Sequence, residues 1–203
     1  MVDRFSDRIV SEYTRPGKKR GQQTLKTIII YNSKTGFTKR YADWLAEELC
    51  CGVHPYKGFA KSSIEANDII IFCSRVHAGK IEHLKDVKQH FNTQSKQSLI
   101  VVATGATPAA VVDAIKKIWA NNFTDTEIKS IPHFYLQSGL NYEKMGFVDR
   151  IIMKTVSRLM QRKKDKNEEE AGFEQAIRHS YDISSKEYIM PVVTFVRNKI
   201  SQG

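Results

Sequence analysis

Residues 33–38 read Ser33-Lys34-Thr35-Gly36-Phe37-Thr38 and lie between an apolar run, residues 28–31, and an amphipathic segment that begins near Lys39. These flanks predict a buried strand followed by a helix, so the six residues form a loop at the helix amino terminus. Backbone N–H groups of a first helical turn have no intrahelical acceptor, and the helix dipole favours an anion there. Three hydroxyls and a glycine at such a helix end predict a phosphate-binding loop.

A helix cap rich in Ser and Thr is the structural alternative for this loop. It explains a hydroxyl at Ser33 or at Thr35, but not three hydroxyls around a glycine directly after an apolar strand. The spacing is not that of a Walker loop, which requires G-x-x-x-x-G-K-S/T. We therefore expect hydroxyls and backbone amides to hold the phosphate, with Lys34 either adding charge or facing solvent.

Apolar runs alternate with helical patterns along most of the chain. Strands are expected at residues 25–31, 53–56, 68–73, 98–103 and 133–137, and helices at about 38–50, 81–91 and 108–120. Pro55 places the second strand at a sheet edge. The alternation predicts an α/β protein, a three-layer sandwich around a five-stranded parallel sheet of order 2-1-3-4-5. In such sheets ligands bind beyond the carboxyl ends of the strands.

The chain reads as one domain with two attachments. Residues 1–24 are expected to be an extension with a basic linker, residues 25–203 the domain, and about 143–184 a helical insertion after the fifth strand. Within it, residues 147–162 predict a helix whose apolar arc holds Val148, Ile151, Ile152, Val156 and Leu159. Basic residues lie along or beside its other face, at Arg150, Lys154 and Arg158. An apolar helix at 188–199 is expected to cover one face of the sheet.

Charge is the most informative feature of the composition. The 203 residues carry a formal net charge of +10, which implies attraction to a membrane surface, a nucleic acid, an acidic protein or a carboxylate-bearing substrate. The sequence shows no basic stripe with aromatic stacking platforms, so no nucleic-acid partner is expected. It has no apolar run of roughly 18 residues and no signal peptide, so we expect a cytoplasmic protein, either free or at the membrane periphery.

The three cysteines, Cys50, Cys51 and Cys73, lack both a metal-ligand spacing and an even disulfide framework. They are expected to be reduced thiols. No metal site is expected, and the oligomeric state is left open.

From about Leu25 to Lys199 the sequence resembles flavodoxin-domain proteins. The similarity is carried by Tyr31-Asn-Ser-Lys-Thr-Gly-Phe-Thr38, which is similar to their FMN-phosphate loop. Gly146 to Lys154 reads G-F-V-D-R-I-I-M-K, similar to a Tyr-Asp-Arg-Phe-Met-Ile-Lys type of segment in menaquinone-dependent protoporphyrinogen dehydrogenases. The resemblance implies a flavodoxin-like fold and an FMN-dependent oxidoreductase that oxidises protoporphyrinogen with a quinone acceptor.

Two other functions remain open, and with them whether the chain is an enzyme at all. One is a flavodoxin-type electron-transfer protein for an acidic partner, and the other is an interaction module of the same fold without FMN. Shuttle flavodoxins are acidic, whereas a charge of +10 suits a quinone-holding anionic membrane or an anionic small-molecule substrate. Arg150, Lys154 and Arg158 are candidates for that contact, or form a plain solvated helix face.

The resemblance and the sheet order together place the flavin site on the loops after the strands. No catalytic side chain is expected, because the flavin carries the redox chemistry and the protein orients it. His77 is either a proton donor or a loop histidine without a role, and Tyr135, Tyr142 and Phe147 either shield the ring or pack elsewhere. The expected cofactor-binding residues are Ser33, Lys34, Thr35, Gly36, Phe37, Thr38, Ser74, Arg75, Val76, His77, Ala78, Gly79, Thr104, Gly105, Ala106 and Gly139.

Overall fold

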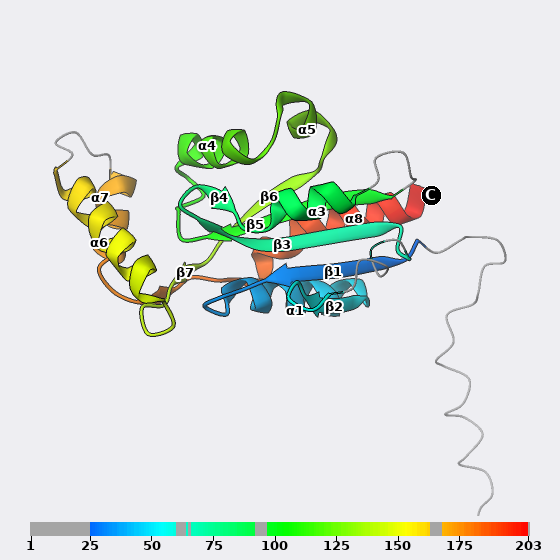
Figure 1. The fold of residues 1–203 in the computed structure, drawn as a ribbon, viewed down its shortest axis with the longest axis horizontal. Helices are drawn as coiled ribbons and strands as arrows, with labels where there is room; N and C mark the ends of the chain where they lie inside the picture. Colours follow the sequence, from blue (N-terminus) through cyan, green and yellow to red (C-terminus); the bar gives the residue numbers. More distant parts are fainter. Residues whose placement is uncertain (1–24, 60–63, 65, 92–96, 163–167, 203) are drawn as a thin grey trace, which may run out of the picture.

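The computed structural model describes residues 25–59, 64, 66–91, 97–162 and 168–202. It consists of a sheet between helices, with two further helices beyond one end of the strands (Figure 1). The expected extension at residues 1–24 lies outside the described residues.

The sheet has the predicted parallel order. Its path runs β2 (Gly52–Pro55), β1 (Thr27–Asn32), β3 (Ile69–His77), β5 (Ser98–Gly105) and β6 (His133–Gln137). All four pairings along this path are parallel. The strand that contains Pro55 lies at an edge, as expected, because proline cannot donate a ladder hydrogen bond.

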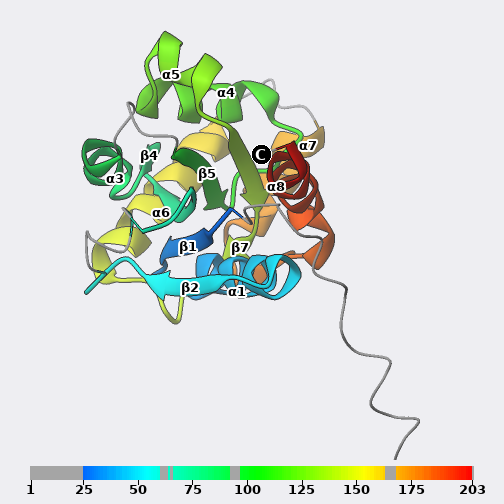
Figure 2. The same cartoon turned by 90° about the vertical axis from the view of Figure 1, so that its right-hand side faces the viewer.

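Alternation along the strands creates two cores, one on each face of the sheet. Ile29, Ile71 and Val102 face α1 (Phe37–Leu49) and α8 (Met190–Gln202). Ile30 and Phe72 face α3 (Leu84–His90) and α4 (Val112–Asn122). Figure 2 shows these helices on opposite sides of the sheet, so the runs of isoleucine correspond to strands buried on both faces.

Several local predictions were wrong. The stretch expected to be a loop after the third strand, residues 74–79, continues β3 through His77 and turns at Ala78 and Gly79 into β4 (Lys80–Ile81). Both turn residues have positive φ, 49° and 76°, the geometry of a tight hairpin turn. The next helix therefore begins at Leu84 rather than near Ile81. A short helix, α5 (Asp125–Ser130), was not expected, although Thr124 and Glu127 form a capping box at its start.

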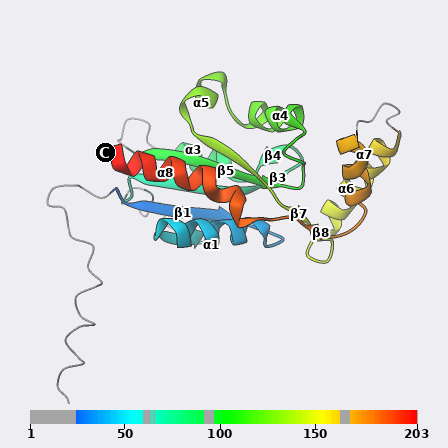
Figure 3. The same cartoon turned by 180° about the vertical axis from the view of Figure 1, so that it is seen from behind.

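The insertion is held at its base by a two-stranded ribbon. β7 (Gly139–Leu140) pairs antiparallel with β8 (Tyr181–Asp182), and between them lie α6 (Phe147–Arg162) and α7 (Glu168–Ala176), here called the arm. A Cβ on Gly139 would lie 2.0 Å from the Tyr181 carbonyl oxygen, so only glycine permits this approach. Figure 3 shows the arm beyond the carboxyl ends of the strands. A 3₁₀ turn, Lys186–Ile189, then leads into α8.

The arm helix α6 has the predicted bounds, but its apolar residues do not all face inward. Val148, Ile151 and Leu159 are exposed, whereas Val156 lines a cavity; the side chain of Ile152 lies outside the described set. Among the described residues, no helix is long and apolar enough to cross a bilayer. All three cysteines are unpaired, and Cys73 is buried in the core.

Candidate functional site

A cavity of about 270 Å³ lies between the carboxyl ends of the strands and the arm. Ligand sites of proteins occupy roughly 300–1,000 Å³, so this volume lies close to the lower end of that range. Four segments of the chain line it: the start of α1, the end of β3, the loop after β5, and the arm with its ribbon. The lining residues are Thr35, Phe37, Thr38, Arg75, Val76, His77, Ala78, Gly79, Thr104, Gly105, Ala106, Thr107, Ser138, Gly139, Leu140, Met145, Asp149, Met153 and Val156.

The loop at residues 33–38, the phosphate loop, presents the amino terminus of α1. Gly36 is the N-cap residue with φ 100°, and its N–H bonds to Oγ of Ser33 at 3.2 Å. No side chain caps the helix, and a Cβ on Gly36 would meet nothing within 4 Å. The first turn of the helix therefore lacks a side-chain cap, which fits a bound phosphate.

Thr38 connects this loop to the carboxyl end of β5. Its Oγ1 lies 2.7 Å from Oγ1 of Thr104, and both residues are almost completely buried. Only one of the two hydroxyl protons is needed for this bond, so the pair retains a second proton for an acceptor in the cavity. The bond also fixes the spacing between two walls of the cavity.

A polar cluster below the cavity orients Arg75. Nε of Arg75 donates to Oε2 of Glu82 at 2.7 Å, and Asn32 donates to the same oxygen at 2.9 Å. Burial alone would favour the protonated acid, but the hydrogen bonds from Arg75 and Asn32 and the charge of Arg75 hold the pKa of Glu82 below its ordinary value. Ser74 is fully buried and donates to the Glu82 carbonyl at 2.7 Å.

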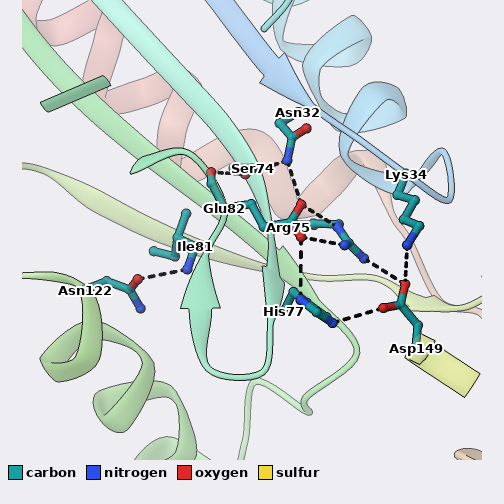
Figure 4. Close-up of polar contacts among 9 residues, drawn as sticks. All are labelled: Asn32, Lys34, Ser74, Arg75, His77, Ile81, Glu82, Asn122 and Asp149. Atoms are coloured by element: carbon teal, nitrogen blue, oxygen red, sulfur yellow. Dashed lines mark hydrogen bonds and ion pairs between the residues drawn. The ribbon is translucent and has the colours of Figure 1, made fainter. Parts of the chain in front are cut away.

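Asp149 of α6 reaches into this cluster from the arm, as Figure 4 shows. Its Oδ2 accepts from Nζ of Lys34 at 2.8 Å and from Nη1 of Arg75 at 3.4 Å. Nε2 of His77 lies 3.0 Å from Oδ1, within ion-pair distance but outside hydrogen-bond alignment. Burial opposes ionisation, yet the Lys34 bond and the charges of Arg75, Lys34 and His77 outweigh it and lower the pKa of Asp149.

The arm supplies the most apolar wall. Met145, Met153 and Val156 face the cavity opposite the loops of the sheet. The base of the arm is attached to the same loops, since the Tyr181 hydroxyl donates to the Ala106 carbonyl at 3.1 Å. Apolar side chains of this kind line most small-molecule sites in proteins.

The structure brings most of the expected site residues to the cavity. Four of them do not line it. Ser33 and Gly36 shape the loop, Lys34 pairs with Asp149, and Ser74 is buried under Glu82. The hydroxyl of Tyr135 bonds to the Thr107 carbonyl at 2.9 Å, that of Tyr142 bonds to the Ile177 carbonyl, and the side chain of Phe147 is exposed. These three aromatic residues are not among the lining residues.

Sequence reasoning missed the arm's contribution to the site. Thr107, Ser138 and Leu140 are next to predicted site residues, so extending each loop by one or two positions would have included them. Asp149, Met145, Met153 and Val156 are distant in sequence. The available signals were the motif at Gly146 to Lys154 and, within it, Asp149, the single acid of the otherwise basic helix at residues 147–162.

Comparison with known proteins identifies a family for this chain. The flavodoxin domain family matches residues 28–167, well over half of the chain. Solved structures that resemble it include a flavodoxin from the domain Archaea (12% identity, TM-score 0.36, covering 76% of this chain and 100% of that one) and Streptococcus pneumoniae TIGR4 flavodoxin (16%, 0.38, 75% and 94%). The Trp repressor binding protein of Bacillus subtilis is a third (14%, 0.36, 69% and 100%).

No curated protein matches the chain. All the lining residues of the cavity lie within the matched range. The chain therefore belongs to the flavodoxin domain family, and this membership indicates that it binds a flavin.

Proposed function

We propose that this protein is an FMN-dependent oxidoreductase. The observation that carries the proposal is the uncapped amino terminus of α1, with Gly36 at φ 100°, opening onto a cavity at the carboxyl ends of the parallel strands. A phosphate at residues 33–38 places the rest of the mononucleotide in that cavity. This arrangement favours FMN over riboflavin, which has no phosphate, and over a larger dinucleotide.

The residues of the chain bind and enclose the cofactor rather than react. The phosphate loop supplies N–H groups and hydroxyls, and Thr104, Gly105 and Ala106 lie along one edge of the cavity. Met145, Met153 and Val156 of the arm exclude water from the opposite side. The bound flavin supplies the redox chemistry, and it accepts and passes on electrons singly or in pairs.

For the substrate we propose a reduced anionic compound of the protoporphyrinogen type, with a quinone as acceptor. Each turnover moves two electrons and two protons from the porphyrinogen to the quinone, which becomes a quinol. The charge of +10 supports an anionic substrate, because propionates are drawn to a positive surface. Lys34 and Arg75 are paired with Asp149 and Glu82, so the exposed Arg150, Lys154 and Arg158 are the cations proposed to attract it.

A one-electron carrier for an acidic partner is the second candidate. It needs the same cofactor site, and the exposed basic residues of α6 would complement an acidic docking surface. A domain that binds no flavin and serves only in protein interactions is the third. The three differ in flavin binding and turnover, so one set of experiments separates them.

The test is anaerobic oxidation of protoporphyrinogen by the FMN-loaded full chain with a water-soluble quinone, followed by porphyrin fluorescence. The control is an equal concentration of free FMN, and a second control is Thr35→Glu, which places a negative charge where the phosphate binds. A rate well above free FMN, lost in Thr35→Glu, supports the enzyme. Flavin binding without turnover supports the carrier, and absence of flavin binding supports the interaction module.

A further inference from the structure

The outer face of α6 carries large apolar side chains in contact with solvent. Phe147 is 79% exposed, Val148 64%, Leu159 61% and Ile151 49%. The same helix directs Asp149, Met153 and Val156 toward the cavity. The exposed residues are therefore not a core stripe left open by chance: α6 has an inner face that serves the site and an apolar outer face without a partner in the described part of the chain.

Basic residues share this outer face. Arg150, Lys154, Arg158 and Arg162 are all exposed and follow one another at four-residue intervals, which places them along one side of the helix. The single acid of α6 is Asp149, whose side chain is 8% exposed and turned toward Lys34. The charge that α6 presents to solvent is thus entirely positive.

We propose that the outer face of α6 docks on an anionic lipid surface. A helix with bulky apolar residues beside Lys and Arg lies in the plane of a membrane interface, with its rings and aliphatic chains among the acyl groups and its cations at the headgroups. The chain's charge of +10 adds long-range attraction to such a surface. Glu168, Glu169 and Glu170 begin α7, so the attraction belongs to α6 and not to the arm as a whole.

The charges and the apolar residues together favour lipid over other occupants. A second copy of the chain presents the same positive face, and two such faces repel. A nucleic acid would satisfy the arginines but would leave Phe147 and Ile151 against a hydrated sugar–phosphate backbone. An anionic membrane offers both the charge and an apolar layer.

Docking at α6 also orients the site. Because the inner face of α6 lines the cavity, a membrane on its outer face would lie one helix away from the ligand. Compounds dissolved in the lipid would then reach the cavity along α6. The docking itself does not depend on the proposed reaction, and it is tested without any turnover.

The experiment is co-sedimentation of the purified full chain with vesicles of phosphatidylcholine alone or mixed with phosphatidylglycerol. Binding is expected only to the mixed vesicles, and it should weaken as salt is raised, since exposed charges are screened. Three exposed basic residues contribute roughly a factor of five each at a membrane surface, so Arg150→Gln/Lys154→Gln/Arg158→Gln should lower the partition coefficient on the order of 100-fold. Phe147→Ser/Ile151→Ser should lower it as well, at unchanged charge.

The matched control removes the same charge elsewhere, with Lys116→Gln/Lys117→Gln/Lys129→Gln on the exposed sides of α4 and α5. It should retain most of the binding. The proposal is overturned if the wild-type chain does not bind mixed vesicles, or if the control loses as much binding as the α6 charge variant. It is also overturned if Phe147→Ser/Ile151→Ser binds vesicles normally and instead converts a dimer to a monomer in sedimentation velocity, because the face is then a contact between copies. Thermal unfolding of each variant checks that it is folded.

Discussion

Nζ of Lys34 donates to Oδ2 of Asp149 at 2.8 Å, and this bond joins the phosphate loop to the arm across 115 residues of sequence. The same carboxylate faces Arg75 and His77, which lie at the end of β3 (Figure 4). One buried acid therefore connects α6 to two of the segments that build the cavity. We expect this side chain to contribute to holding the arm over the site, together with the ribbon of β7 and β8.

Asp149→Asn is expected to loosen α6 while the sheet remains folded. The amide keeps the size of the side chain but removes the charge that Lys34 and Arg75 neutralise, and hydrogen bonds to charged groups contribute about 1.5–3 kcal/mol each at most. Amide hydrogen exchange should become faster across residues 147–162 and stay unchanged in β1 and β3. Asp43→Asn is the matched control, because Asp43 pairs with Lys39 at 2.7 Å on the exposed side of α1. Equal exchange in α6 of both variants would contradict this role.

Lowering the pH should weaken the contact of Asp149 with Lys34 and Arg75. Because the pKa of Asp149 is lowered in the folded chain, the unfolded chain binds the proton more tightly, and the stability that this gives is complete above the unfolded value of about 3.9. It is lost as the pH falls through the lowered folded value. The difference in free energy of unfolding between wild type and Asp149→Asn should be fully present at about pH 5 and shrink toward about pH 3. A difference that grows between about pH 5 and pH 3 would mean that the folded chain raises the pKa of the carboxyl group.

The buried hydroxyl pair of Thr38 and Thr104 predicts non-additive changes in stability, which a double-mutant cycle measures. Thr38→Val or Thr104→Val alone leaves one buried hydroxyl without its partner and should cost about 1–3 kcal/mol in urea unfolding. Thr38→Val/Thr104→Val removes both hydroxyls at nearly the same shape and should cost less than the two single changes added together. Additive costs would show that the hydroxyls do not depend on each other.

Gly139→Ala tests the ribbon that anchors the arm. The new Cβ would lie 2.0 Å from a backbone oxygen of Tyr181, so β8 must move, and overpacking of this kind costs about 1–3 kcal/mol or more. Gly172→Ala is the control in the same arm, because its Cβ would meet nothing within 4 Å and alanine favours a helix. We expect a lower melting temperature for Gly139→Ala and an equal or higher one for Gly172→Ala. Equal melting temperatures would mean that the ribbon adjusts without cost.

The fold was predictable because its signals are local. Ile28, Ile29 and Ile30 can be buried on both sides only in a strand covered by helices, and a parallel sheet follows from the alternation with helical patterns. The hydroxyls and the glycine of residues 33–38 likewise predict a loop at the amino terminus of a helix. The hairpin at Ala78 and Gly79 was missed because alanine seldom adopts positive φ, so the sequence held no turn signal of the usual kind.

The arm's part in the site was not predictable from periodicity. Asp149 is one residue from Val148, and only the path of the chain through the ribbon of β7 and β8 decides that the first faces the cavity and the second faces solvent. The predicted apolar arc of α6 divides between the cavity wall, at Val156, and an exposed surface, at Val148, Ile151 and Leu159. Long-range contacts such as that of Asp149 with Lys34 leave no mark in the local pattern.

The measurement that tests the central claim most directly is a paired titration of the full chain with FMN and with riboflavin, followed by flavin fluorescence. If the amino terminus of α1 holds the phosphate, FMN should bind at least on the order of 100-fold more tightly than riboflavin, and Thr35→Glu should abolish that preference while leaving riboflavin binding largely unchanged. Equal affinities for the two flavins, or no binding of either, would contradict the assignment of residues 33–38 as an FMN-phosphate loop.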